Sequence, residues 1–229
     1  MSEPRRFVVA LDGPGSSGKS SVGAAAARRL GYRFCDTGLL YRAVTWLAIE
    51  RSVDLGDVNR LAALGGEVGL APDEEGRLSR VIVGGCDVTE QVRTAAIDER
   101  VSDVARVAEV RAALLPRQRA IAAEGGIIMA GRDIGTVVLP DADLKLFLDA
   151  SVEERARRRA AERGLEPGEP AARQILAELR RRDRIDSTRA VAPLRVAPDA
   201  VRIVTDGLSF EETVEAVVAA IRRTEADDR

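Results

Sequence analysis

Five short and largely apolar runs divide the chain, at residues 7–11, 32–35, 126–130, 144–148 and 201–204. Apolar runs of this length are typical of strands that are buried on both faces of a sheet. Stretches of helical character separate them, as the crossover connections of a parallel sheet require. The pattern therefore predicts an α/β fold with a five-stranded, doubly wound parallel sheet flanked by helices.

Helices are expected over residues 21–30, 39–51, 95–123 (as one helix or in broken pieces) and 210–222. In the second of these, apolar residues recur at helical spacing. Pro116 predicts a boundary or a kink in the third, because proline has no N–H to donate to the helical hydrogen bonds. The polar residues that follow the last helix are expected to fray.

From about residue 67 the pattern changes to short strand-like pieces, which span residues 68–70, 78–83 and 86–88. Gly84 and Gly85 separate the last two pieces, and a two-residue connection of this kind is typical of a β-hairpin. The sequence therefore predicts a small antiparallel β insert on the parallel core, over residues 66–92.

Residues 153–195 form the most arginine-rich stretch of the chain. Its arginines include Arg155, Arg157, Arg158, Arg159, Arg163, Arg173, Arg180, Arg181, Arg182, Arg184 and Arg189. Two prolines and two glycines within residues 164–170 interrupt it, so we expect two helices joined by a mobile turn. The segment could be a lid that closes over phosphates. Alternatively its arginines could pair with nearby glutamates on a solvated surface, and we favour this for most of them.

Two pairs of these arginines are better placed to face a ligand. Arg155 and Arg159 lie four residues apart, on one helix face that could point at a nucleotide. The same spacing joins Arg180 and Arg184.

The chain has 229 residues, enough for one α/β domain with insertions. We predict a single domain over residues 1–229, with a helical, arginine-rich lid at residues 153–195 and the insert at residues 66–92. The core then comprises residues 1–65, 93–152 and 196–229.

Residues 13–20, Gly-Pro-Gly-Ser-Ser-Gly-Lys-Ser, match the phosphate-binding motif G-x-x-x-x-G-K-[ST] at every fixed position. The motif stands between a predicted strand and a predicted helix, which is the context that it requires. Its glycines let several N–H groups point at one phosphate, and the helix N-terminus adds positive charge. Lys19 can reach the β- and γ-phosphates, and Ser20 can ligate magnesium. Phosphate binding is therefore predicted, although the motif alone does not identify the phosphorylated substrate.

The composition excludes several kinds of site. The chain has no histidine and two cysteines, which excludes histidine general-base catalysis and leaves too few ligands for a zinc site. The net charge of −2 gives no overall attraction to nucleic acid, and an aromatic content of 3% leaves few side chains to stack on bases. The sequence contains no signal-peptide pattern and no run long enough to span a membrane. We therefore expect a cytoplasmic protein with no membrane or nucleic-acid partner.

Charged and hydroxyl side chains follow several predicted strands, namely Asp12, Asp36, Thr37, Arg132, Asp133 and Asp206. Because the carboxyl ends of parallel strands meet at one edge of the sheet, these side chains should surround one crevice. We expect Arg132 and Asp133 to be functional on this ground. Asp133 could instead serve only as the ion-pair partner of Arg132.

Four segments carry a family resemblance. They are residues 11–14 before the phosphate motif, residues 36–42 (Asp-Thr-Gly-Leu-Leu-Tyr-Arg), residues 131–138 (Gly-Arg-Asp-Ile-Gly-Thr-Val-Val) and residues 189–194 (Arg-Ala-Val-Ala-Pro-Leu). Together they resemble bacterial cytidylate kinases, in the same order and over nearly the whole chain. The first segment is shared with many kinases, and the other three are more specific. The resemblance implies a P-loop kinase fold with a nucleotide-binding insert, and transfer of the γ-phosphoryl group of ATP to CMP or dCMP with magnesium.

The resemblance also implies roles for individual residues. ATP would be bound by Gly13, Pro14, Gly15, Ser16, Ser17, Gly18, Lys19, Ser20 and Ser21. CMP would be bound by Thr37, Arg42, Ser102, Arg111, Arg132, Asp133, Asp186 and Arg189. Ser20 would hold the metal, and the catalytic candidates are Lys19, Arg132, Arg159 and Arg184.

Other functions remain open at this point. A P-loop kinase could act on another small acceptor, such as UMP, AMP or shikimate. A nucleotide-dependent switch of the GTPase type would need an Asn-Lys-x-Asp element, which is absent, and Asn59 is the only asparagine. A nucleic-acid binder could use the arginine-rich stretch, but its stacking platforms would be few. We expect a monomer that takes CMP, dCMP and ATP.

Overall fold

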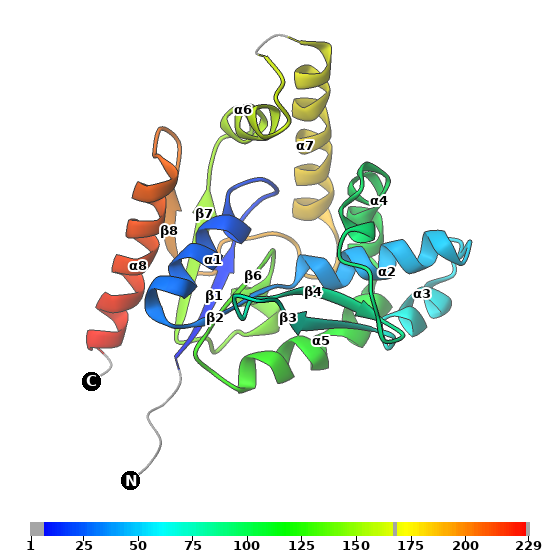
Figure 1. Cartoon of the computed structure of the whole chain (residues 1–229), viewed down its shortest axis with the longest axis horizontal. Coiled ribbons are helices and arrows are strands. Elements are labelled where there is room, and N and C mark those ends of the chain that lie inside the picture. Colours follow the sequence, from blue (N-terminus) through cyan, green and yellow to red (C-terminus); the bar gives the residue numbers. More distant parts are fainter. Residues whose placement is uncertain (1–6, 167–168, 228–229) are drawn as a thin grey trace.

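Five parallel strands form the centre of the fold (Figure 1). The structure is a computed structural model that describes residues 7–166 and 169–227. The five strands are β1 (Val8–Asp12), β2 (Arg33–Asp36), β6 (Ile127–Gly131), β7 (Leu144–Asp149) and β8 (Val201–Val204). They pair in parallel in the order β2-β6-β1-β7-β8. The predicted parallel sheet is therefore confirmed.

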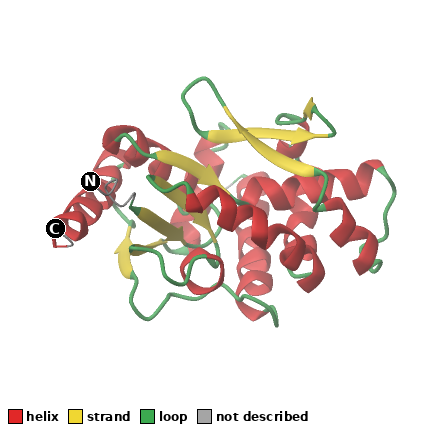
Figure 2. Ribbon diagram, turned by 90° about the horizontal axis from the view of Figure 1, so that it is seen from below, coloured by secondary structure: helices red, strands yellow, loops and turns green. Residues whose placement is uncertain are grey.

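The insert is antiparallel, as expected, but it is not separate from the sheet. Its strands are β3 (Val68–Pro72), β4 (Leu78–Val83) and β5 (Cys86–Asp87). Strand β4 also pairs with β2 in parallel where Leu78 lies opposite Cys35, so all eight strands join in one sheet. Figure 2 shows the longer insert strands along one side of the molecule, beside a group of helices.

Eight α-helices surround the sheet in the described part of the chain. They are α1 (Lys19–Leu30), α2 (Gly38–Glu50), α3 (Val58–Leu64), α4 (Ala95–Ala105), α5 (Ala108–Ala123), α6 (Val152–Glu162), α7 (Pro170–Thr188) and α8 (Phe210–Asp227). Two single turns complete the described elements, η1 (Gln91–Arg93) and η2 (Ile134–Val138).

The alternation of side chains along β1 explains how helices cover both faces of the sheet. Val9 and Leu11 point to one face and pack in the apolar cluster of α1 and α8. Ala10, between them, points to the other face and packs with Met129 of β6 and Ala122 of α5. Because successive residues of a strand point to opposite faces, an unbroken apolar run is buried on both.

Three helical details differ from the expectations. Helix α3 was not predicted, although Asp57 supplies a side-chain cap by accepting the N–H of Arg60. The long helix breaks at Val107, whose backbone is extended (φ −72°, ψ 119°), whereas Pro116 lies inside α5 and does not end it. The tail is helical to Asp227 rather than frayed after the last predicted turn.

A hydrogen bond explains why the tail is ordered. The Tyr32 hydroxyl donates to the Glu225 carboxylate and thereby ties the last turns of α8 to the segment before β2.

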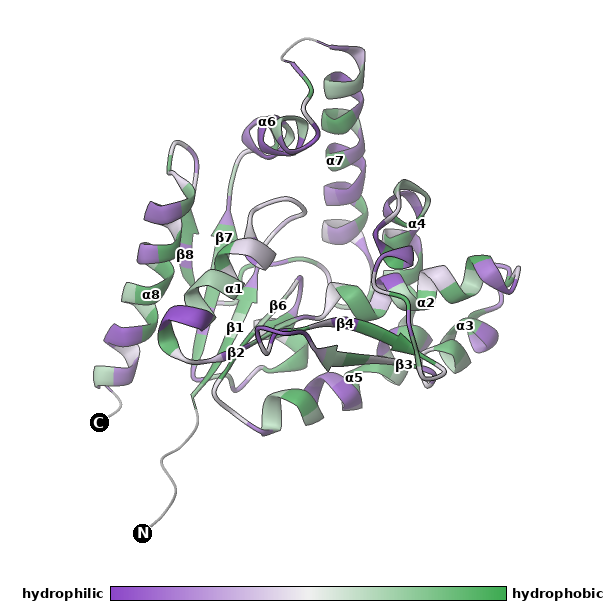
Figure 3. Cartoon of the chain, in the orientation of Figure 1, coloured by the Kyte–Doolittle hydropathy of each residue, from purple (hydrophilic) through white to green (hydrophobic). Residues whose placement is uncertain are grey.

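The lid contains two helices, as predicted, and they stand above the carboxyl ends of the parallel strands (Figure 1). Ala156 and Ala160 of α6 pack against Ile175 and Leu179 of α7 in a small apolar cluster. The remaining surface of both helices is strongly hydrophilic (Figure 3). Pro167 and Gly168, in the expected mobile turn, lie outside the described residues.

Two residues at the end of β1 fix the phosphate loop to the rest of the sheet. Both carboxylate oxygens of Asp12 accept backbone N–H groups, one from Ile134 and one from Gly135, each at 2.8 Å. Gly13 follows with a φ of +152°, and a Cβ added there would overlap the carbonyl oxygen of Leu148 in β7. The loop therefore depends on a residue without a side chain at position 13.

We predict that Gly13→Ala lowers the free energy of unfolding by about 3 kcal/mol, because a methyl group would have to displace backbone of β7. Gly15→Ala is the matched control in the same loop, since its added Cβ would lie 3.6 Å from the nearest heavy atom, an ordinary contact. The control should lose less than about 1 kcal/mol in urea unfolding. Equal losses in both variants would contradict the close approach to β7.

We also predict a pH dependence of stability from Asp12. Burial raises its pKa from 3.8 to about 6, although the N–H groups of Gly135 and Ile134 act in the opposite direction. The folded state therefore favours the protonated carboxyl, so the stability that this group contributes is present below pH 4 and is lost as the pH rises through 6.

Urea unfolding of the wild type and of Asp12→Asn at several pH values tests this prediction. The wild type should lose up to about 3 kcal/mol relative to the variant between pH 4 and pH 7. A difference that does not vary with pH would overturn it.

Candidate active site

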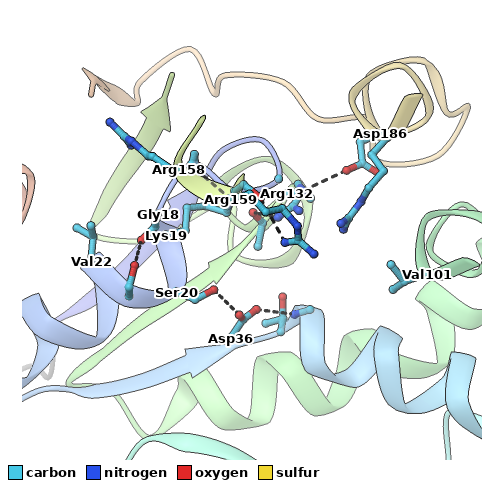
Figure 4. A pocket seen from close by; sticks show the side chains of 18 of the residues that line it. Gly18, Lys19, Ser20, Val22, Asp36, Val101, Arg132, Arg158, Arg159 and Asp186 are labelled. Carbon is cyan, nitrogen blue, oxygen red and sulfur yellow. Dashed lines mark hydrogen bonds and ion pairs between the residues drawn. The ribbon is translucent and has the colours of Figure 1, made fainter. Parts of the chain in front are cut away.

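A cavity of about 800 Å³ opens at the carboxyl ends of the parallel strands. Its lining comes from the phosphate loop, α2, α4, the turn after β6, and both lid helices. Figure 4 shows Lys19, Arg132, Arg159 and Asp186 gathered around it from four different elements. The crevice expected from the strand ends is therefore present, and Asp36, Thr37, Arg132 and Asp133 line it. Asp12 and Asp206 lie outside its lining, because Asp12 accepts backbone N–H groups after β6 and Asp206 accepts from Ser151.

The phosphate loop curls around the ammonium group of Lys19. Its Nζ donates to the carbonyl oxygen of Pro14 at 2.6 Å and to Ser17 Oγ at 3.2 Å. Left-handed backbone at Ser16 (φ 59°) and Gly18 (φ 88°) gives the loop its curvature, and Gly18 leads into the N-terminus of α1. Burial, together with the nearby charge of Arg132, lowers the pKa of Lys19 well below its usual value. An anion at this loop would meet both the ammonium group and the positive end of a helix.

Ser20 and Asp36 bring two oxygen-bearing side chains together beside the loop. Ser20 Oγ donates to Asp36 Oδ2 at 2.5 Å, and Asp36 Oδ1 accepts the N–H of Gly38 at 3.0 Å. Within residues 7–166 and 169–227 no group of three metal-ligating side chains occurs. Magnesium suits such a place, because it is commonly held by one or two protein oxygens together with substrate phosphates and water. The sequence analysis placed Asp36 at this edge but gave it no role toward the metal.

Asp133 lies buried between two arginines. It accepts hydrogen bonds from Arg111 and, at 3.2 Å, from Arg189 Nη2. Arg111 also lies over the ring of Tyr41, 5.3 Å from its centroid. Arg132 pairs instead with Asp186, its Nε donating at 3.1 Å. The alternative in which Asp133 only serves Arg132 is therefore not what the structure contains.

Two hydroxyl groups predicted to surround a base also line this cavity. Thr37 Oγ1 donates to the carbonyl oxygen of Ala130 at 2.9 Å, which leaves its lone pairs able to accept. Ser102 of α4 is buried on the cavity wall. The structure thus brings Thr37, Ser102, Arg111 and Asp133 together from four separate segments.

The arginines of the two predicted pairs, Arg155 with Arg159 and Arg180 with Arg184, do not face the cavity together. Arg159 lines the cavity, but Arg155 lies behind the phosphate loop, where it donates to the carbonyl oxygen of Gly15 at 2.9 Å and pairs with Asp183. Arg180 pairs with Glu153 at the surface. Arg184 is exposed and lies outside the cavity lining, so the structure does not bring this predicted catalytic residue to the site.

Arg182 lines the cavity in place of Arg184. Its Nε is buried without a hydrogen-bond partner in the described residues, and burial lowers its pKa to about 10. Helical spacing explains its position, since residues 175, 179, 182 and 186 recur at intervals of four, three and four along α7. Ile175 and Leu179 begin this buried stripe, and Arg182 and Asp186 continue it into the cavity.

Asp98 is a second residue that the sequence analysis missed. It lies on α4, where its carboxylate accepts hydrogen bonds from Arg42 and, at 2.5 Å, from Arg159. Arg182 Nη1 is 3.6 Å from the same carboxylate. Asp98 stands four residues before Ser102, so the two share one helix face.

A search for membrane-spanning elements among residues 7–166 and 169–227 finds no helix with the length and apolar character that a crossing requires.

Comparison with known proteins agrees with this architecture. One solved structure, an uncharacterized protein from Eubacterium ventriosum, superposes with a TM-score of 0.52 at 11% identity, covering 96% of this chain and 99% of that one. At this identity the likeness concerns the fold alone.

Sequence relatives are much closer. A cytidylate kinase from Geobacillus kaustophilus is 47% identical over 95% of this chain and 97% of its own length. One from Pelotomaculum thermopropionicum is 48% identical over 93% of this chain and 95% of its own length. The family model of cytidylate kinase matches residues 9–223. These matches, together with a phosphate loop and a polar cavity in one place, show that the chain belongs to the cytidylate kinase family.

Proposed function

We propose that this protein transfers the γ-phosphoryl group of ATP to CMP and dCMP, giving the diphosphates and ADP. The observation that carries the proposal is the buried set of Asp133, Arg111 and Arg189 within one cavity of the phosphate loop. These three side chains offer one hydrogen-bond acceptor and two donors to a base, and they line the same cavity as the phosphate loop. The cytidylate kinases to which the chain is similar support the choice of substrate.

The phosphate loop and the lid would bind ATP. Lys19 would neutralise charge on the transferring group, and Arg159 would approach the same oxygens from α6, with Arg182 added to the set that the sequence predicted. Ser20 and Asp36 would hold magnesium, which when bound neutralises negative charge on the phosphate oxygens. For Arg184 to act as the predicted catalytic residue the lid would have to move, because Arg184 is exposed and lies outside the cavity lining.

The opposite side of the cavity would bind the acceptor. Arg42 and Arg132 would hold the CMP phosphate, and Asp186 and Arg189 would approach the ribose and phosphate. A nucleoside phosphate is already an oxyanion, so it needs positioning and charge neutralisation more than a general base. This agrees with a chain that has no histidine.

Base selection follows from hydrogen-bond polarity. Cytosine presents an amino donor at position 4 and acceptors at N3 and O2, whereas uracil presents an acceptor at position 4 and a donor at N3. The Asp133 carboxylate would accept from the cytosine amino group, and Arg111 would donate to N3 or O2. Uracil would leave these buried groups facing groups of the same polarity, which is costly. Thr37, whose hydroxyl donates to the carbonyl oxygen of Ala130, can accept, whereas Ser102 can donate or accept, and the two would complete the base site.

Several finer points remain part of this proposal. We propose that the protein acts in the cytoplasm as a monomer, without nucleic-acid or membrane partners. We also propose that the segments at residues 66–92 and 153–195 serve as the nucleotide-binding insert and the lid of one kinase domain, residues 1–229.

An ADP-release assay across CMP, dCMP, UMP, AMP and shikimate tests the function. CMP and dCMP should be phosphorylated fastest, and Lys19→Ala should lower kcat about 100-fold or more because a charge at the transferring phosphoryl group is lost. Lys145→Ala is the control, since Lys145 is the only other lysine and pairs with Asp199 outside the cavity. Faster turnover of AMP or shikimate, or full activity of a folded Lys19→Ala variant, would contradict the proposal.

Asp133→Ala should narrow the preference for CMP over UMP at least about tenfold in kcat/KM, the worth of a hydrogen bond to a charged group. The measured quantity is the ratio of kcat/KM for CMP to kcat/KM for UMP, because this ratio does not depend on the fraction of enzyme that is folded. Asp186→Ala is the matched control, since it also removes an arginine partner in the same cavity but would act on the ribose, which CMP and UMP share. Equal losses on both substrates in Asp133→Ala would mean that Asp133 does not read the base.

A further inference from the structure

The carboxylate of Asp98 gathers arginines from three separate helices, and Arg163, the C-terminal cap of α6, lies 4.0 Å from it as a fourth. Arg42 comes from α2, Arg159 from α6 and Arg182 from α7. The Asp98 side chain is 17% exposed, and the three arginine side chains are between 17% and 22% exposed. The contact is therefore largely withdrawn from solvent, where ion pairs are screened less than at the surface.

The cluster carries more positive than negative charge. Burial alone would raise the pKa of Asp98, but the charges of Arg42 and Arg159 outweigh it and keep the pKa below its usual value. Asp98 is thus ionised at neutral pH, yet one carboxylate cannot balance the four guanidinium groups that lie within 4.0 Å of it. An additional or competing anion of higher charge, such as a phosphate, would be attracted to the same arginines.

The position of these arginines lets them change partners. A second cavity, of about 640 Å³, adjoins the first and is lined by Asp98. Arg42 and Arg159 line both cavities, so their guanidinium groups stand on the boundary between Asp98 and the space proposed for nucleotide. Small rotations of these side chains would turn them from the carboxylate to a phosphate.

Asp98 also joins the lid to the rest of the protein. Arg159 and Arg182 belong to the lid helices, whereas Asp98 and Arg42 belong to helices of the opposite wall. Within the described residues, the other ion pair between α4 and α7 is a more exposed one, in which Arg181 lies 3.5 Å from Asp103. The less exposed ion pairs that hold α6 and α7 toward α4 therefore centre on Asp98.

We propose that Asp98 is a positioning residue that holds the lid over the cavity before nucleotides bind, by occupying arginines that phosphates later take. The proposal rests on the proposed function in one respect, namely that the competing anions are the phosphates of ATP and CMP. It assigns Asp98 no contact with the reacting atoms. Its effect is exerted through Arg42, Arg159 and Arg182.

Hydrogen exchange of the lid in the full-length protein tests this inference. Without nucleotide, Asp98→Asn should exchange at least about tenfold faster than the wild type in residues 155–163 and 170–188, because the amide keeps the shape but loses the charge. With CMP and a non-hydrolysable ATP analogue, the two proteins should exchange within about twofold of each other, since phosphates then hold the arginines. Asp103→Asn is the matched control on the same helix, and it should resemble the wild type in both states.

Each outcome decides a separate point. Equal exchange of free wild type and free Asp98→Asn would overturn the inference, and so would faster exchange of the variant in both states, which would indicate a merely structural role. If the free proteins differ but nucleotides protect neither, Asp98 still holds the lid while the proposed nucleotide function fails.

Discussion

The structure depends on the neutralisation of buried arginines by carboxylates from other elements. Each carboxylate of the site has its own partners: Asp133 pairs with Arg111 and Arg189, and Asp186 with Arg132. Asp98 pairs with arginines of α2 and the lid, and Asp183 holds Arg155. Removing either member of such a buried pair would leave an uncompensated charge, which is costly. The protein thus tolerates many arginines around one cavity because carboxylates from several elements offset their charge.

These ion pairs join segments that are distant in the chain, and they lie where a ligand would bind. A ligand with phosphates and a hydrogen-bonding base offers the same chemistry as the internal carboxylates, namely negative oxygens and matched acceptors. Our proposal is that substrate groups replace some of these internal partners, so that the arginines keep a negative partner in both states. Asp12 differs from these carboxylates because its hydrogen bonds come from the backbone N–H groups of Ile134 and Gly135 and not from arginines. These bonds fix the turn that carries Arg132 and Asp133.

The sheet and the phosphate loop could be predicted because their signals are local. An apolar run such as residues 126–130 is buried on both faces wherever it pairs, and the motif at residues 13–20 carries its own backbone requirements. The antiparallel insert followed from turn chemistry at Gly84 and Gly85. Its parallel contact with β2 did not, because one register pair between Cys35 and Leu78 leaves no pattern in either segment.

The site was predicted less completely, since the direction of a charged side chain is a tertiary property. Arg180 and Arg184 share a helix face, but nothing in their spacing says which way that face points. The packing of Ile175 and Leu179 on α6 decides this, and it turns Arg182 inward. A role for Asp98 could not be predicted because its partners, Arg42 and Arg159, are far away in the sequence.

The central claim is that the internal carboxylates and the nucleotides share one set of arginines. A crystal structure with CMP and a non-hydrolysable ATP analogue tests it most directly, through the partners of Arg42, Arg111 and Arg159. The account predicts that Arg42 and Arg159 leave Asp98 for phosphate oxygens, and that Arg111 and Asp133 contact the cytosine ring. Nucleotides bound with every one of these ion pairs intact would contradict it.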